Sequence, residues 1–139
     1  MQGERETMNA KTVRRILVVD DNVDAADSLA VILRMGGHEV STAYSAASAL
    51  EIAADSPEID VFILDIGLPG MNGYELAREL RKSPHAKQAL LIALTGYGQD
   101  TDRERAYNAE FDAHCTKPIE YGVLNQLLAR SGSKRGAPQ

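Results

Sequence analysis

The stretch that decides the fold reads VFILDIGLPGMNG and spans residues 61–73. Its first four residues form a continuous apolar run, which is the pattern of a strand buried on both faces of a parallel sheet. The run ends at Asp65, and the residues after it include three glycines and a proline, a density that predicts a tight, shaped turn. We therefore expect a buried strand that presents an aspartate at its carboxyl end.

Other strand patterns lie on either side of this stretch and end in the same way. Ile16 to Val19 is followed by Asp20 and Asp21, Ala89 to Leu94 is followed by Thr95, and Ala113 to Thr116 is followed by Lys117. A weaker strand pattern, from His38 to Tyr44, has no acid or base at its end. We therefore expect five strands, four of which end in polar side chains.

Helical patterns alternate with these strands. Apolar residues recur at helical spacing from Val23 to Leu33, and the pair Gly36 and Gly37 is typical of a helix end. Further helical patterns follow the N-cap candidate Ser45, cover residues 74–82 and 101–109, and run from Val123 to Leu128. This alternation predicts an α/β fold, a doubly wound five-stranded parallel sheet with about five helices on both faces.

Length and composition restrict the classes of function. The 139 residues, 44% of them hydrophobic, predict one folded domain over residues 14–130, between flexible tails at 1–13 and 131–139. The net charge of -5 provides no electrostatic footprint for nucleic acid, so no nucleic-acid partner is expected. The chain has no apolar run of membrane-spanning length and no signal peptide, so we expect a cytoplasmic protein without a membrane partner.

The polar residues at the strand ends form the candidate site. In an open parallel sheet, ligands bind outside the carboxyl ends of the strands, where residues distant in sequence meet. Carboxylates crowded at that edge repel one another, so such a cluster needs a compensating charge. A divalent cation supplies it, and Mg2+ suits a short set of oxygen ligands. The expected ligand region contains Asp20, Asp21 and Asp65.

Two further side chains suit a phosphoryl group at the same edge. Lys117 offers a positive charge and Thr95 a hydroxyl donor, and both fit the equatorial oxygens of a phosphoryl group in transfer. A carboxylate can attack phosphorus and hold an acyl phosphate, so Asp65 is the expected nucleophile. The residues alone thus predict cation-dependent phosphorylation of an aspartate.

Four short motifs in combination identify a known family. They are VVDD at residues 18–21, LDIGLPGMNG at 64–73, ALTG at 93–96 and TKP at 116–118. Each is weak evidence alone, but together they closely resemble the receiver domain of two-component response regulators, in particular single-domain regulators like those of chemotaxis. The resemblance covers nearly all of residues 14–129. It implies a flavodoxin-like sheet of strand order 2-1-3-4-5, in which the strand without a polar end residue is the outer edge.

The resemblance also implies a role for each site residue. Asp65 would accept a phosphoryl group from a histidine kinase or a histidine phosphotransfer protein. Mg2+, with Mn2+ as a substitute, would be bound by Asp21, Asp65 and the backbone carbonyl of Gly67, with Asp20 holding a metal-bound water and Thr95 and Lys117 binding the phosphoryl oxygens. A cis peptide bond between Lys117 and Pro118 is expected as well.

The chain departs from the family pattern at the switch. Family members usually carry Tyr or Phe three residues before the lysine, and His114 occupies that position here. The conformational relay from Thr95 therefore uses His114, uses Tyr97 instead, or passes little signal by this route. The structural reading of His114 is a histidine packed on the last strand, neither a metal ligand nor a phosphoacceptor.

Signal output is expected through protein contacts, on a face built from the helix at 101–109, the last strand and the last helix. Such a protein is not an enzyme beyond its own aspartyl phosphorylation and dephosphorylation. One alternative is a phosphatase of the haloacid dehalogenase type, but that family needs a second acid where Gly67 stands. Another is a receiver-like module that binds partners without phosphorylation. The sequence does not identify the cognate kinase, and it leaves open a free-standing regulator or a receiver from a hybrid kinase.

Overall fold

The structure is a computed structural model, and it describes residues 13–96 and 110–129. Its strands are β1 (Arg15–Val19), β2 (Glu39–Ala43), β3 (Val61–Asp65), β4 (Leu90–Thr95) and β5 (Ala113–Thr116). Its helices are α2 (Val23–Met35), α3 (Ala46–Asp55), α4 (Gly73–Arg81), the short 3-10 helix η1 (Pro84–Ala86) and α6 (Tyr121–Ala129). All neighbouring strands pair in parallel, in the order β2-β1-β3-β4-β5, which confirms the predicted fold class and strand order.

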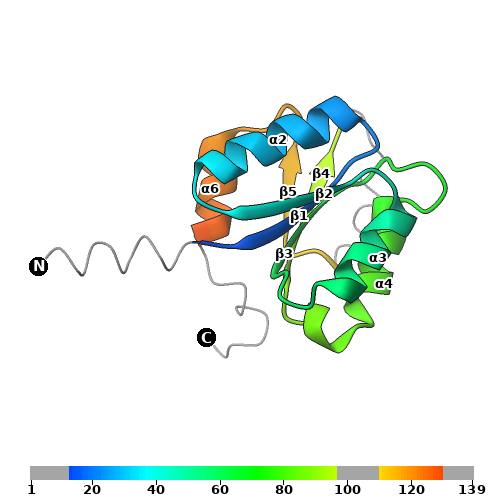
Figure 1. Cartoon of the computed structure of the whole chain (residues 1–139). Helices are drawn as coiled ribbons and strands as arrows, with labels where there is room; N and C mark the ends of the chain where they lie inside the picture. Colours follow the sequence, from blue (N-terminus) through cyan, green and yellow to red (C-terminus); the bar gives the residue numbers. More distant parts are fainter. Residues whose placement is uncertain (1–12, 97–109, 130–139) are drawn as a thin grey trace, which may run out of the picture.

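The helices lie in two layers around the sheet. Helices α2 and α6 cover one face, and α3 and α4 cover the other (Figure 1). Each layer encloses its own apolar core, one including Ile16, Val18 and Leu124, the other including Leu17, Phe62 and Tyr74. Strands β3 and β4 are buried at every position, as expected for continuous apolar runs covered on both faces.

The described residues contain four α-helices, whereas about five were predicted. The remaining prediction, the helix at 101–109, lies outside the described residues, as do Tyr97 and nearly all of the two predicted tails. The predicted limits of the other elements differ from the observed ones by a residue or two, because pattern alone does not show which residue makes the last hydrogen bond. Strand β2 is an edge of the sheet, as predicted.

Side chains cap the helices that lead away from the strands. Ser45 accepts a hydrogen bond from the N–H of Ser48 at the start of α3, which confirms the predicted N-cap. Asn72 accepts from the N–H of Glu75, whose carboxylate accepts in return from the N–H of Asn72, and this capping box starts α4. These bonds fix where each helix leaves the sheet edge that carries the polar residues.

Two arginines tie separate elements together away from those strand ends. The partly buried guanidinium of Arg81 donates to the carbonyls of Ala86, Lys87, Ala89 and Glu110 and pairs with Asp112 at 3.1 Å. Arg14, just before β1, donates from Nε to the carbonyl of Leu128 near the end of α6. Its backbone N–H donates to the ring Nδ1 of His38. The last helix is thereby connected to the beginnings of β1 and β2.

The open side of β2 also has a side-chain partner. The N–H of Glu39 donates to the carbonyl of Arg14, on the side of β2 that faces β1. Successive residues of a strand direct their backbone groups to opposite sides, so the carbonyl of Val40 points to the side of β2 that has no neighbouring strand. There the carbonyl accepts a hydrogen bond of 2.9 Å from Arg34 of α2. One exposed backbone acceptor of the edge strand is therefore occupied by a guanidinium of the same chain.

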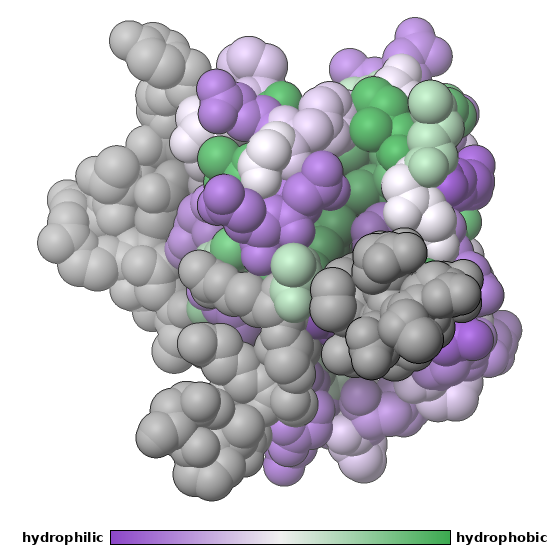
Figure 2. All heavy atoms as spheres, turned by 90° about the vertical axis from the view of Figure 1, so that its left-hand side faces the viewer, coloured by the Kyte–Doolittle hydropathy of each residue, from purple (hydrophilic) through white to green (hydrophobic). Residues whose placement is uncertain are grey.

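The face of the molecule in Figure 2 carries both polar and apolar side chains. Figure 2, which views the molecule from the side toward which α2 ends, shows a green apolar area at the upper right among purple side chains. On α2 the exposed large apolar side chains include Val31, Ile32 and Met35. No helix within the described residues has both the length and the apolar character to cross a membrane.

Candidate functional site

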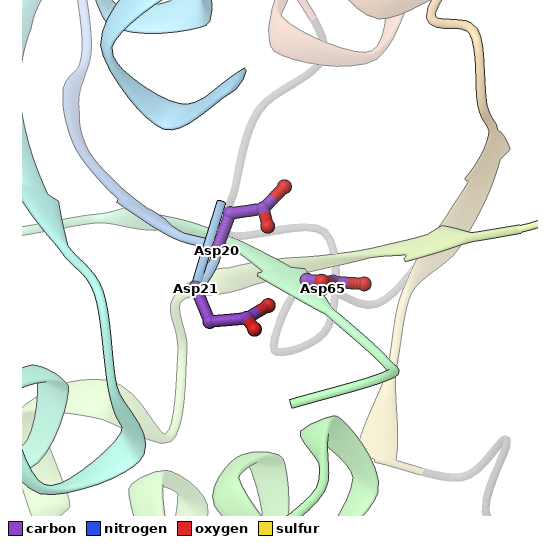
Figure 3. A group of neighbouring side chains, drawn as sticks. All are labelled: Asp20, Asp21 and Asp65. Atoms are coloured by element: carbon purple, nitrogen blue, oxygen red, sulfur yellow. The ribbon is translucent and has the colours of Figure 1, made fainter. Parts of the chain in front are cut away.

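Three carboxylates meet at the carboxyl ends of β1 and β3. Asp20 and Asp21 follow β1 directly, and Asp65 is the last residue of β3. One oxygen from each lies within 4.8 Å of the others, and Figure 3 shows the three side chains extending toward the same side. Asp20 and Asp65 are buried while Asp21 is exposed, so the cluster opens to solvent on one side. The structure therefore brings together the three predicted ligand side chains.

Backbone hydrogen bonds hold the two buried carboxylates. Oδ1 of Asp20 accepts from the N–H of Asn22 at 3.0 Å, and Oδ1 of Asp65 accepts from the N–H of Gly67 at 3.1 Å. In both cases the donor lies two residues further along the chain, as in an Asx turn. Asn22 also caps α2 with its side chain. Asn22 was not predicted as a site residue, and the signal for it in the sequence is its place as an N-cap candidate two residues after Asp20.

Lys117 reaches the cluster from the loop after β5. Its Nζ lies 3.3 Å from Oδ2 of Asp20 and 3.3 Å from Oδ1 of Asp65, so one ammonium group bridges both buried carboxylates. Partial burial lowers the pKa of Lys117, but the negative charges of Asp65 and Asp20 outweigh this effect and hold that pKa above its usual value. The lysine is therefore a stable positive charge at neutral pH.

The electrostatics of Asp20 show why the cluster suits a cation. Burial raises the pKa of Asp20, and the neighbouring charge of Asp65 raises it further, while the bond from Asn22 and the charge of Lys117 lower it; the net pKa is raised. A single ammonium group thus does not fully compensate the carboxylates. Three carboxylate oxygens within reach of one another are the donors that Mg2+ prefers, so the residues present fit this ion.

Thr95 is the last residue of β4 and is buried. Its carbonyl accepts a hydrogen bond of 2.9 Å from the N–H of Lys117, so the ends of β4 and β5 are joined at this edge. The Lys117–Pro118 peptide bond is cis, as predicted. The predicted metal-binding and phosphoryl-binding residues therefore all belong to strand ends or turns at one edge of the sheet, namely Asp20, Asp21, Asp65, Gly67, Thr95 and Lys117.

The predicted packing of His114 is only partly correct. His114 lies on β5, with its ring centroid 5.8 Å from that of Phe111, but its side chain is exposed. Strand β5 is the other edge of the sheet, and Cys115 is the one buried residue among its four. A groove of about 500 Å3 runs beside this strand and α6, lined by residues including His114, Lys117, Glu120 and Val123.

Comparisons with known proteins agree with this geometry. The family described as "Response regulator receiver domain" matches residues 16–129. The transcriptional regulatory protein KdpE of Mycobacterium tuberculosis is 37% identical over 115 residues, which cover 83% of this chain and 48% of that relative. The chain therefore spans about half the length of KdpE.

Solved structures show the same arrangement. A response regulator receiver domain protein of Clostridium thermocellum has a TM-score of 0.79 at 27% identity, covering 89% of this chain and 97% of that one. The response regulator TrrA of Thermotoga maritima, in complex with Mg2+ and BeF, has a TM-score of 0.70 at 33% identity, covering 82% and 95%. With the family match over most of its length, this chain belongs to the response regulator receiver domain family.

Proposed function

We propose that the chain is a Mg2+-dependent phosphorylation switch in which Asp65 accepts the phosphoryl group. The observation that supports this most directly is the position of Lys117, whose ammonium group lies 3.3 Å from an oxygen of Asp65 and of Asp20. A phosphoryl group attached to Asp65 would bring its negative oxygens within reach of this charge. The complex of the related TrrA with Mg2+ and BeF supports the same combination of cation and anion at such a site.

In this proposal each residue has a defined task. Asp21, Asp65 and the backbone carbonyl of Gly67 would hold Mg2+, and Asp20 would hold a water bound to it. The cation supplies positive charge that neutralises the phosphoryl oxygens during transfer. A carboxylate oxygen of Asp65 forms the new P–O bond as the N–P bond of a phosphohistidine donor breaks, and the imidazole leaves. Thr95 donates its hydroxyl hydrogen, and Lys117 its ammonium hydrogens, to the transferred group.

The partners follow from this chemistry. The donor is a histidine kinase or a histidine phosphotransfer protein, and the receiver, folded over residues 14–130, signals by contacting a downstream protein without acting as an enzyme on other molecules. The groove beside β5 and α6 supports an output surface there. The helix at 101–109, the third element of the predicted face, and the switch candidate Tyr97 lie outside the described residues. Mn2+ in place of Mg2+, and a cytoplasmic location, stay predictions.

The first test is the intact mass of the protein after incubation with acetyl phosphate, with and without Mg2+. We expect one phosphoryl group on the wild type in the presence of Mg2+ and none on Asp65→Asn, because the amide cannot form an acyl phosphate. Asp55→Asn, which removes an exposed carboxylate at the end of α3, serves as the matched control and should be labelled like the wild type.

A blank result with acetyl phosphate calls for the same measurement with a phosphohistidine donor. If the wild type stays unlabelled with both donors, the proposed function is wrong and a phosphorylation-independent binding module is favoured. Release of many phosphates per chain from a phosphomonoester would instead favour a phosphatase.

A further inference from the structure

Gly73, the first residue of α4, lies directly against the backbone of the strand end that carries Asp65. Its N–H donates to the carbonyl of Ile66 at 3.0 Å. A Cβ at this position would lie 2.6 Å from the carbonyl oxygen of Asp65 and 2.7 Å from Cα of Ile66. Real Cβ atoms essentially never come within 3.0 Å of such atoms, so only glycine allows this approach.

Both sides of this contact are firmly held. On the β3 side, the N–H of Ile66 donates to the carbonyl of Leu94 at 3.0 Å, and every residue of β3 is buried. On the α4 side, the capping box at Asn72 fixes the start of the helix, and the next residue, Tyr74, is buried in the core. Close-packed interiors transmit strain. An added methyl group must therefore displace the short turn between the two elements.

This turn carries the groups on which the proposed function rests. The carboxylate of Asp65 accepts its hydrogen bond from Gly67 within the turn, and the carbonyl of Gly67 is a proposed Mg2+ ligand. Asp20 and Asp21 follow β1 and belong to a different segment of the chain. A displacement of the turn therefore changes the distances of Asp65 and Gly67 from these two aspartates.

We propose that Gly73 is a positioning residue for the phosphoryl-accepting site. By allowing α4 to rest on the backbone of Asp65 and Ile66, it sets the distance of Asp65 and Gly67 from the two aspartates that follow β1. Gly73 itself touches neither the ion nor the phosphoryl donor. This inference rests on the proposed function, because it assigns Gly73 a part in the same site.

The test compares Gly73→Ala with Gly122→Ala. Gly122 lies in the first turn of α6, and a Cβ there meets nothing within 4 Å, so this variant adds the same methyl group without a collision. We measure the Mg2+ dissociation constant by titration calorimetry, the phosphorylation rate at saturating acetyl phosphate, and unfolding in urea. For Gly73→Ala we expect Mg2+ binding weakened and phosphorylation slowed by about tenfold or more, since misplacing groups by about 1 Å can cost ~100-fold.

A merely structural role would give a different result. It would lower the urea midpoint of Gly73→Ala but leave the Mg2+ dissociation constant of the folded protein unchanged. A folded Gly73→Ala variant whose Mg2+ dissociation constant and phosphorylation rate both match those of Gly122→Ala overturns the inference. If the wild type binds Mg2+ but no donor labels it, the proposed function fails, while the comparison of Mg2+ affinities still tests Gly73.

A measurement on the wild type covers the case in which Gly73→Ala does not fold. Coupling between sites is reciprocal. If the position of this turn affects the affinity for Mg2+, then bound Mg2+ must also restrict the movement of the turn. We expect saturating Mg2+ to slow hydrogen exchange of the Gly73 amide about tenfold more than that of the Leu124 amide. The N–H of Leu124 donates to the carbonyl of Glu120, the residue before α6, and serves as the matched control. Equal slowing of the two amides overturns the inference.

Discussion

At the scale of single residues, we expect Asp20 to lower the stability of the fold when no cation is bound and to be needed for tight binding of Mg2+. Its pKa is raised by burial and by the charge of Asp65, so its ionised form is less favoured in the folded chain than in the unfolded chain. The amide of asparagine keeps the oxygen that accepts from Asn22. We therefore expect Asp20→Asn to unfold at a higher urea concentration than the wild type when EDTA removes divalent cations.

The same variant should bind Mg2+ less tightly, by about 10- to 100-fold, the range typical for losing a group that orients metal ligands or their water. Urea unfolding in EDTA and calorimetric titration with Mg2+ measure the two effects separately. Asp55→Asn is again the control, and it should change neither quantity. A lower urea midpoint for Asp20→Asn in EDTA would contradict the assignment of repulsion to this cluster.

At the scale of elements, the side chain of Arg81 joins several separate segments of the chain. Its side chain is only 9% exposed, and it joins the end of α4, η1, the residue before β4 and the residues before β5. Arg81→Met keeps much of the apolar stem but leaves Asp112 without this cation. We expect the free energy of unfolding to fall by about 3–5 kcal/mol, the usual cost of breaking a buried ion pair.

Urea unfolding monitored by circular dichroism measures this loss. The control is Lys82→Met at the neighbouring position, where the side chain is 66% exposed and pairs with the partly exposed carboxylate of Glu79. Its effect should stay within about 0.5 kcal/mol. A loss for Arg81→Met as small as that for the control would show that the carbonyl contacts and the pair with Asp112 contribute little.

The sequence predicted the strands and the main site, because buried parallel strands give long apolar runs and the site residues stand where those runs stop. The strand order came from the resemblance to the receiver family. It did not indicate Arg81, since an arginine among other charges on an amphipathic helix looks the same whether it is solvated or bound to carbonyls. Gly73 was recognised only as a turn residue. Its close approach to Asp65 depends on the angle at which α4 leaves the sheet, and no local pattern encodes that angle.

At the scale of the whole molecule, Arg14 and His38 link the beginning of the sheet to its last helix, and this link depends on pH. Nδ1 of His38 accepts a hydrogen bond from the N–H of Arg14, which requires a neutral ring with a free lone pair. Burial and the charge of Arg14 lower the pKa of His38, and Asp60 opposes this only in part. The unfolded chain therefore binds a proton at a higher pH than the folded chain does.

Stability should fall as the pH drops below the ordinary value for histidine, about 6.5, and continue to fall until the folded protein is protonated as well. Above that value this group contributes no pH dependence. We expect His38→Gln to show a smaller loss of unfolding free energy than the wild type between about pH 7.5 and about pH 5.5. Urea unfolding at both pH values measures it, with His85→Gln as a control that behaves like the wild type. Identical pH dependence in all three proteins would contradict the prediction.

The hydrogen bond from Arg34 to the Val40 carbonyl has a consequence for neighbouring copies of the chain. An open edge strand is a template on which another strand can be laid down, and natural sheets guard such edges with charged side chains. Here the charged side chain is Arg34 of α2, so it reaches the edge strand only after α2 has packed against the sheet. Before docking, the Val40 carbonyl lacks this partner, so we expect the β2 edge of a newly made chain to be more open to pairing with a strand of another copy than it is in the folded protein.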